Sequence, residues 1–387
     1  MTPGSTVLPE LEMRPHGREW LVGRQDTGTA IALPPEGLDA LLLLDAGCPP
    51  DEARAALRHA TGRDLDVRAF AEGLGAAGLA DAVGDHRYEH RPVRESLPAV
   101  RRRHLRWTLH PALHGVLLLL ALCGPVVALA EPDARPPWSD LLAPRYGVVT
   151  LAVQAVTTWT LILLHELAHL FTARAVGVRG RLGLGTRLQF LVAQTEVSGI
   201  WLKGRRERLT VYLSGLVLDA AIAGACLIAR AAGADHPLLS VVVLTLTYSS
   251  AVQCLVFMRT DLYYVLQDLS GSHNLYAEAT ALLRRFPPAG RRHAGARLGV
   301  HAYALLVAIG SAACVVFGLA MLHEVTLPLA GRSMEAVVGG RTPAERADGL
   351  ATLLVLLSIQ GLWARTWWRK HWGKGQAPSP TAGLEQD

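Results

Sequence analysis

Six apolar segments, each about 20 residues long or longer, follow one another after residue 109. A helix rises 1.5 Å per residue, so about 20 residues cross roughly 30 Å of hydrocarbon. The segments cover residues 110–130, 147–173, 209–230, 238–258, 298–322 and 347–364. This pattern predicts a mainly α protein, a polytopic membrane helical bundle of about six spans.

Basic residues gather on alternate sides of these segments. They lie before the first segment at Arg101–Arg106, between the second and third, between the fourth and fifth, and after the last. Loops rich in Arg and Lys stay in the cytoplasm. The sequence also begins without an apolar signal segment. We therefore expect an integral protein of a lipid bilayer, the bacterial plasma membrane, with both termini cytoplasmic.

Charge separates the N-terminal region from the rest of the chain. Residues 1–95 hold 10 Arg and 16 Asp or Glu, a net charge of −6, whereas the remaining residues carry +11. An acidic region on a basic membrane body argues against nucleic-acid binding. The predicted domains are a soluble module at 1–95, a basic juxtamembrane linker at 96–109, the membrane domain at 110–364, and a basic and aromatic tail at 365–387.

The soluble module has the element pattern of a winged helix. Short strands are predicted at 20–22 and 30–33 around the turn Asp26-Thr27-Gly28. Three helices follow, the first two opened by proline pairs and the second stopped by Gly62, before a final short strand. The module is therefore predicted to be a small winged-helix-like α+β domain.

The second apolar segment contains His165-Glu166-Leu167-Ala168-His169. Residues four apart share one face of a helix. Two imidazoles one turn apart can bind one zinc ion, and the glutamate between them can act as the base for its water. Ionisable residues are costly in hydrocarbon, so their presence favours a functional site. The alternative is a packed polar cluster without metal.

A catalytic zinc ion usually has three protein ligands and a water. Asp261, near the predicted cytoplasmic end of the fourth segment, is the candidate third ligand. His169 lies five residues before Arg174, and Asp261 lies two residues after Arg259, so both are expected in the cytoplasmic third of the membrane. The alternative for Asp261 is an interfacial helix cap, and Asp268 is the fallback ligand.

Other polar residues near these motifs allow simpler interpretations. Asp219 either orients a zinc-binding histidine or makes a buried structural hydrogen bond. His110 and His114 are four residues apart but have no glutamate between them, so we expect them at the membrane interface. The five cysteines show no CxxC spacing, which predicts neither disulfides nor a cysteine metal site.

Residues 181–200 alternate in character and contain β-forming side chains. They predict a hairpin that dips toward the metal site and pairs its edge with an extended substrate backbone. The alternative is a surface loop.

This combination of features resembles the site-2 protease family of intramembrane zinc metalloproteases. The resemblance covers about residues 147–270 and rests on His165–His169 in a membrane helix, the β-like segment after it, and the later Asp261. The Asn-Pro and Leu-Asp-Gly pattern usual in the family is absent. Residues 259–271, with the form Arg-Thr-Asp-x-Tyr-Tyr-Val-Leu-x-Asp-Leu-x-Gly, are more similar to the bacterial branch of peptide zinc metalloproteases. The resemblance implies a Zn²⁺ cofactor.

The N-terminal module resembles PqqD-like leader-recognition modules. The similar stretch runs from the turn at Gly28 through Leu41–Gly47 to Phe70–Leu74. Such modules bind leader peptides of ribosomally made, modified peptides by adding a strand to a sheet edge. The resemblance implies a leader peptide as partner for residues 1–95. The alternative is that the module only packs on the membrane domain.

We therefore expect a zinc endopeptidase that hydrolyses a peptide bond in a membrane-embedded or membrane-delivered peptide, in the maturation of a ribosomally made peptide. Glu166 would take the proton of the zinc-bound water and deliver it to the leaving amine. One alternative is cleavage of a membrane-anchored regulator. Others are a non-catalytic protein that carries or senses a metal, and a scaffold subunit of a peptide modification or export complex.

Overall fold

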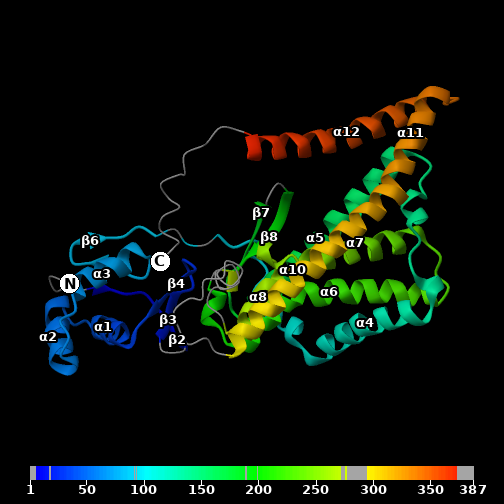
Figure 1. The fold of residues 1–387 in the computed structure, drawn as a ribbon. Coiled ribbons are helices and arrows are strands. Elements are labelled where there is room, and N and C mark those ends of the chain that lie inside the picture. The colour runs from blue at the N-terminus through cyan, green and yellow to red at the C-terminus, as the bar shows by residue number, and fades with distance from the viewer. Residues whose placement is uncertain are drawn as a thin grey trace.

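The computed structural model describes residues 6–372, except 17–18, 91, 93, 188–189, 198, 272–274 and 277–293. A small domain of helices and short strands, called the head below, comprises the described residues up to 90. It lies beside a group of long helices (Figure 1). The predicted fold class is confirmed, since the protein is mainly helical, with long apolar helices and a small N-terminal α+β region.

The head contains two antiparallel sheets and three helices. One sheet has the order β2-β3-β4, and the other has the order β1-β5-β6. The strands are β1 (Thr6–Val7), β2 (Glu12–His16), β3 (Glu19–Arg24), β4 (Thr29–Leu33), β5 (Ala82–Val83) and β6 (His86–Arg87). The helices are α1 (Pro35–Asp45), α2 (Pro50–Thr61) and α3 (Val67–Ala76).

Local sequence explains where the head helices begin and end. Pro35 and Pro50 occupy the first turns of α1 and α2, where no intrahelical amide bond is lost. Gly62, with φ of +71°, ends α2 in the left-handed conformation that favours glycine. Asp66 accepts a hydrogen bond from the amide of Ala69 and so caps α3. These signals fix the three helices close to their predicted places.

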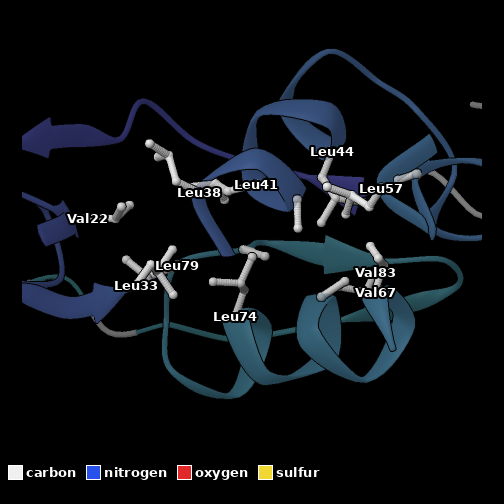
Figure 2. Packing of buried hydrophobic residues seen from close by; sticks show 14 residues of the cluster. Val22, Leu33, Leu38, Leu41, Leu44, Leu57, Val67, Leu74, Leu79 and Val83 are labelled. Atoms are coloured by element: carbon white, nitrogen blue, oxygen red, sulfur yellow. The ribbon is translucent and has the colours of Figure 1, made fainter. Parts of the chain in front are cut away.

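Leucine and valine side chains from β3, β4, β5 and all three helices of the head form its core (Figure 2). Val22 and Leu41 are fully buried, and Leu44 and Leu74 are 1% exposed. Burial of each such side chain contributes roughly 1.5–3 kcal/mol. The head therefore has its own hydrophobic core.

The membrane part consists of long helices joined by short turns. Its helices are α4 (Pro111–Ala130), α5 (Gly147–Ala175), α6 (Arg205–Ala231), α7 (Pro237–Gln253), α8 (Asp261–Ser270), α10 (Ala294–Met321), α11 (Leu327–Gly339) and α12 (Pro343–Trp372). Within the described residues, five helical segments are long and apolar enough to cross a membrane, namely Pro111–Ala130, Gly147–Ala175, Arg205–Ala231, Gly299–Gly339 and Pro343–Thr366. The protein is thus an integral membrane protein by helix length and composition.

The fourth and fifth apolar segments depart from the sequence-based expectation. The segment expected at 238–258 is the 17-residue helix α7, about 25 Å long, which is shorter than the others. The segment expected at 298–322 continues to Gly339, because a π-helical turn at Leu322–Thr326 joins α10 to α11 without interrupting the helix.

Helix α6 occupies the middle of the membrane part and contacts α4, α5, α7 and α8. In contrast, α4 leaves large side chains such as Leu122 and Leu129 mostly exposed, as expected of a surface in contact with lipid. Glycines allow α4 and α6 to approach closely, since a Cβ on Gly224 would lie 2.0 Å from the carbonyl oxygen of Leu120. The central position of α6 lets it face the segment His165–His169 of α5.

A β-hairpin follows α5 directly. Strands β7 (Arg181–Arg187) and β8 (Phe190–Glu196) pair antiparallel, with Leu182 opposite Thr195. The hairpin predicted within residues 181–200 is therefore present. The short helical turn η5 (Ile200–Leu202) connects it to α6.

The head packs against this connecting turn. Glu12 of β2 forms an ion pair of 3.1 Å with Lys203, and Arg14 of the same strand donates a hydrogen bond to the backbone carbonyl of Lys203. The side chain of Leu202 lies against Gly23 of β3, where a Cβ would be only 2.8 Å away from it. The head is thus attached next to the end of the hairpin.

Candidate metal centre

Helix α5 places His165 and His169 on one face, and both side chains are buried. Their Nε2 atoms lie 3.1 Å apart. Asp261, the first residue of α8, brings its Oδ2 atom to 2.9 Å from Nε2 of His165 and 3.3 Å from Nε2 of His169. The structure therefore gathers the three residues predicted as metal ligands into one group that could hold a metal ion.

Helix α6 contacts the far side of both imidazole rings through residues spaced by four. Oδ2 of Asp219 lies 2.8 Å from Nδ1 of His165, and the carbonyl oxygen of Val211 lies 2.8 Å from Nδ1 of His169. Gly215 lies between these two residues, where a Cβ would be 2.5 Å from Nε2 of His169. Since Val211, Gly215 and Asp219 share one face of α6, this face forms the second half of the centre.

These contacts determine which ring nitrogens can bind a metal. A carboxylate and a carbonyl can only accept, so the Nδ1 atom of each histidine carries a proton and Nε2 is the nitrogen left to bind a metal. In neutral imidazoles the lone pairs of both Nε2 atoms face the carboxylate of Asp261. A metal ion, or a proton on an imidazole, would relieve the repulsion between them.

The charges and donor types also fit a divalent metal. Asp219 and Asp261 are two carboxylates in a buried site, and a divalent cation would balance them. The second carboxylate oxygen of Asp219, Oδ1, has no hydrogen-bond partner within the described residues. The negative charge of Asp219 is therefore stabilised through its contact with His165, and a cation bound to that histidine would stabilise it further. Two imidazoles and one carboxylate are a ligand set that suits zinc.

Gln253, the last residue of α7, positions Asp261. Its Nε2 donates to Oδ2 of Asp261 at 3.0 Å, and its Oε1 accepts from the backbone amide of Asp261 at 3.1 Å. The chain turns between them through Arg259, whose φ of +53° lies in the left-handed region that non-glycine residues seldom adopt. Sequence reasoning missed Gln253, although a polar residue at the end of an apolar helix was a visible signal.

Glu166 lies between the two histidines in sequence and is half-buried. Its carboxylate accepts a hydrogen bond of 2.7 Å from the hydroxyl of Thr195 on β8. Glu166 is therefore adjacent to the metal-binding group and in contact with the hairpin. Thr195 was also missed by sequence reasoning, since no spacing rule links residues 29 positions apart.

The other candidate residues have structural partners. Asp268 forms an ion pair with Arg208, and both side chains are only 6% exposed, so the fallback ligand is not brought to the group. His110 accepts a hydrogen bond from a backbone amide in the first turn of α4, and His114 lies 2.8 Å from a backbone carbonyl just before that helix. All five cysteines are free.

Comparison with protein-family models, with curated proteins and with solved structures finds no match for this chain.

Proposed function

We propose that this protein is a zinc-dependent endopeptidase that works within the membrane, as the resemblance to site-2 proteases implies. The observation that supports the proposal is the convergence of His165, His169 and Asp261 beside Glu166 on a helix long and apolar enough to cross the bilayer. A glutamate next to two zinc-binding histidines is the arrangement that metal-assisted amide hydrolysis requires.

Each residue of the group has a role in this proposal. His165, His169 and Asp261 would hold zinc, which when bound polarises the scissile carbonyl and lowers the pKa of its water. Glu166 would accept the proton of that water and pass it to the leaving amine. The contacts of α6 with both rings keep the histidines oriented, as partners of metal-binding imidazoles commonly do.

The substrate of the proposed reaction is an extended peptide segment. Strand β7 is paired with β8 on one side only, and beyond Leu182, whose amide is bonded to Ser96, its outer edge offers backbone groups for an added strand. The hairpin contacts Glu166 through Thr195 of β8, the strand that pairs with β7, which supports a role of the hairpin in presenting the peptide to the proposed base. A membrane-embedded or membrane-delivered peptide could be held there during cleavage.

We propose that the head recruits this peptide by its leader segment. In the sheet with the order β2-β3-β4, β2 contacts the turn at Ile200–Leu202, whereas β4 is the opposite edge strand. An edge strand can accept a peptide as an additional strand. On this account the protein matures a ribosomally made peptide. Cleavage of a membrane-anchored regulator is the alternative that uses the same chemistry without the head.

The test compares the wild type with Glu166→Gln in membranes of the expressing cells. New peptide N-termini are labelled and catalogued by mass spectrometry. We expect termini that the wild type produces and Glu166→Gln does not, a loss of at least about 100-fold, because general-base catalysis contributes 10²–10⁴-fold. Identical catalogues would contradict the proposal and favour a metal carrier or a scaffold.

A further inference from the structure

The side chain that holds Glu166 comes from the hairpin and not from the helical bundle. The hydroxyl of Thr195 lies 2.7 Å from the carboxylate Oε2 of Glu166 and 3.0 Å from its backbone carbonyl oxygen. A glutamate side chain has several rotamers, and a hydrogen bond to a charged carboxylate is stronger than one between neutral groups. The Thr195 hydroxyl therefore selects one position of the Glu166 carboxylate.

The pairing of the hairpin connects Thr195 to the linker before α4. Thr195 lies opposite Leu182 of β7. On the outer edge of β7, the amide of Leu182 donates to the hydroxyl of Ser96 at 2.9 Å, and the amide of Ser96 donates to the carbonyl of Gly180 at 3.2 Å. Ser96 thus contacts the outer edge of β7, and Glu166 contacts the Thr195 side chain of β8, at the same cross-strand position.

Ser96 is in turn fixed to the end of α5. The buried guanidinium of Arg174 donates to the carbonyls of Ser96, Leu97 and Val100 at 2.5–2.8 Å. Leu97 adopts a φ of +55°, a conformation that leucine seldom takes and that these bonds maintain. Since Arg174 and Glu166 belong to the same helix, the contacts form a closed ring from α5 through the linker and the hairpin back to α5.

From this ring we infer that Thr195 is the positioning residue of Glu166 and that Ser96 fixes the hairpin that presents Thr195. The inference rests on the proposed function, since it concerns the base of that reaction. The role is distinct from metal binding, because neither Thr195 nor Ser96 belongs to the metal-binding group. Removing either hydroxyl should leave the metal in place and misplace only the base.

The experiment uses the full-length protein and a synthetic peptide that spans the strongest Glu166-dependent cut. Thr195→Val keeps the shape of the side chain and removes its donor, whereas Thr195→Ser keeps the donor. We expect Thr195→Val to lower kcat about 10- to 100-fold with KM and zinc content unchanged, the effect of losing one hydrogen bond to a charged group. We expect Thr195→Ser to restore most of the rate.

Two further variants separate positioning from folding. Ser96→Ala removes the acceptor of the Leu182 amide, and we expect a several-fold loss of kcat in the same direction. Thr247→Val makes the identical Thr-to-Val change on α7, where the hydroxyl donates to the carbonyl of Val243 in its own helix, and we expect wild-type kinetics.

The outcomes distinguish the inference from the proposed function. A wild type that makes no Glu166-dependent cut overturns the proposed function and the inference with it. A cutting wild type together with wild-type kinetics in Thr195→Val overturns the inference alone. Loss of zinc in Thr195→Val, or failure of Thr195→Ser to restore the rate, would also overturn it, because Thr195 would then serve only the fold.

Discussion

At the scale of single residues, the candidate metal centre depends on the absence of a side chain as much as on the residues that could bind a metal. Gly215 lets α6 approach both imidazoles, and a Cβ there would lie 2.5 Å from Nε2 of His169 and 2.7 Å from Nε2 of His165. These nitrogens are the atoms that would bind the metal. The position therefore requires glycine for a packing reason rather than for backbone flexibility.

We accordingly predict that Gly215→Ala loses most of its bound zinc although alanine is the better helix former. The added methyl group would push the two rings out of the positions that a metal needs. The measurement is zinc per chain by elemental analysis, beside Gly115→Ala on α4, where a Cβ meets nothing within 4 Å. Full zinc content in Gly215→Ala would show that the centre tolerates the displacement.

The residues of the site differ in how far sequence could reveal them. His165, Glu166 and His169 follow from a spacing that one helical turn explains. Asp261 was predicted from its height in the membrane, and the structure brings it to the histidines. Gln253 stood out as a polar residue at the end of an apolar helix, but its contacts and those of Thr195 could not be predicted, because they depend on how separate elements meet.

At the scale of elements, the outer edge of β7 is the surface proposed to hold substrate. The amide of Leu182 points outward to Ser96, and successive residues of a strand alternate in direction. The amide of Leu184 therefore also points outward, beyond Ser96, whereas that of Gly185 points toward β8. These two adjacent positions allow the edge to be tested separately from the hairpin itself.

We predict that Leu184→Pro lowers cleavage about tenfold, chiefly through a higher KM, because it removes one outward amide from the substrate edge. Steady-state kinetics with the synthetic peptide provide the measurement. Gly185→Pro is the comparison, since it breaks pairing with β8 and should also disturb the Thr195 contact and kcat. Unchanged kinetics in Leu184→Pro would exclude strand addition at this edge.

Element boundaries were predictable where the chain carries its own stop signals. Proline at the start and glycine at the end set α1 and α2. The end of the fifth apolar segment, expected at residue 322, was wrong. His323 and Glu324 are a polar break in the sequence, but the helix continues past them through a π-helical turn. Strand β2 was also missed, since Glu12–His16 has no alternating apolar pattern.

At the scale of the whole molecule, the head, the linker and the hairpin form a continuous path to Glu166. The head attaches at the end of the hairpin through Lys203, and the linker attaches at its start through Ser96. A peptide bound by the head would therefore be held beside the proposed substrate edge. The sequence predicted the two domains, but it could not show where one attaches to the other.

If the head recruits a leader, we predict that a substrate peptide with its upstream segment is cut at least tenfold more efficiently than the cut region alone. The upstream segment added as a separate peptide should inhibit cleavage of the long substrate and not of the short one. Competition kinetics measure both effects. Equal cleavage of the two substrates would favour a membrane-anchored regulator, for which the head is not needed.

We propose above all that a divalent metal joins His165, His169 and Asp261. The most direct measurement is elemental analysis of the detergent-purified wild type, His165→Ala, Asp261→Ala and Glu166→Gln. We expect about one zinc per chain in the wild type and in Glu166→Gln, because Glu166 is not among the proposed ligands, and loss of zinc in the other two variants. A folded wild type without bound metal would contradict it.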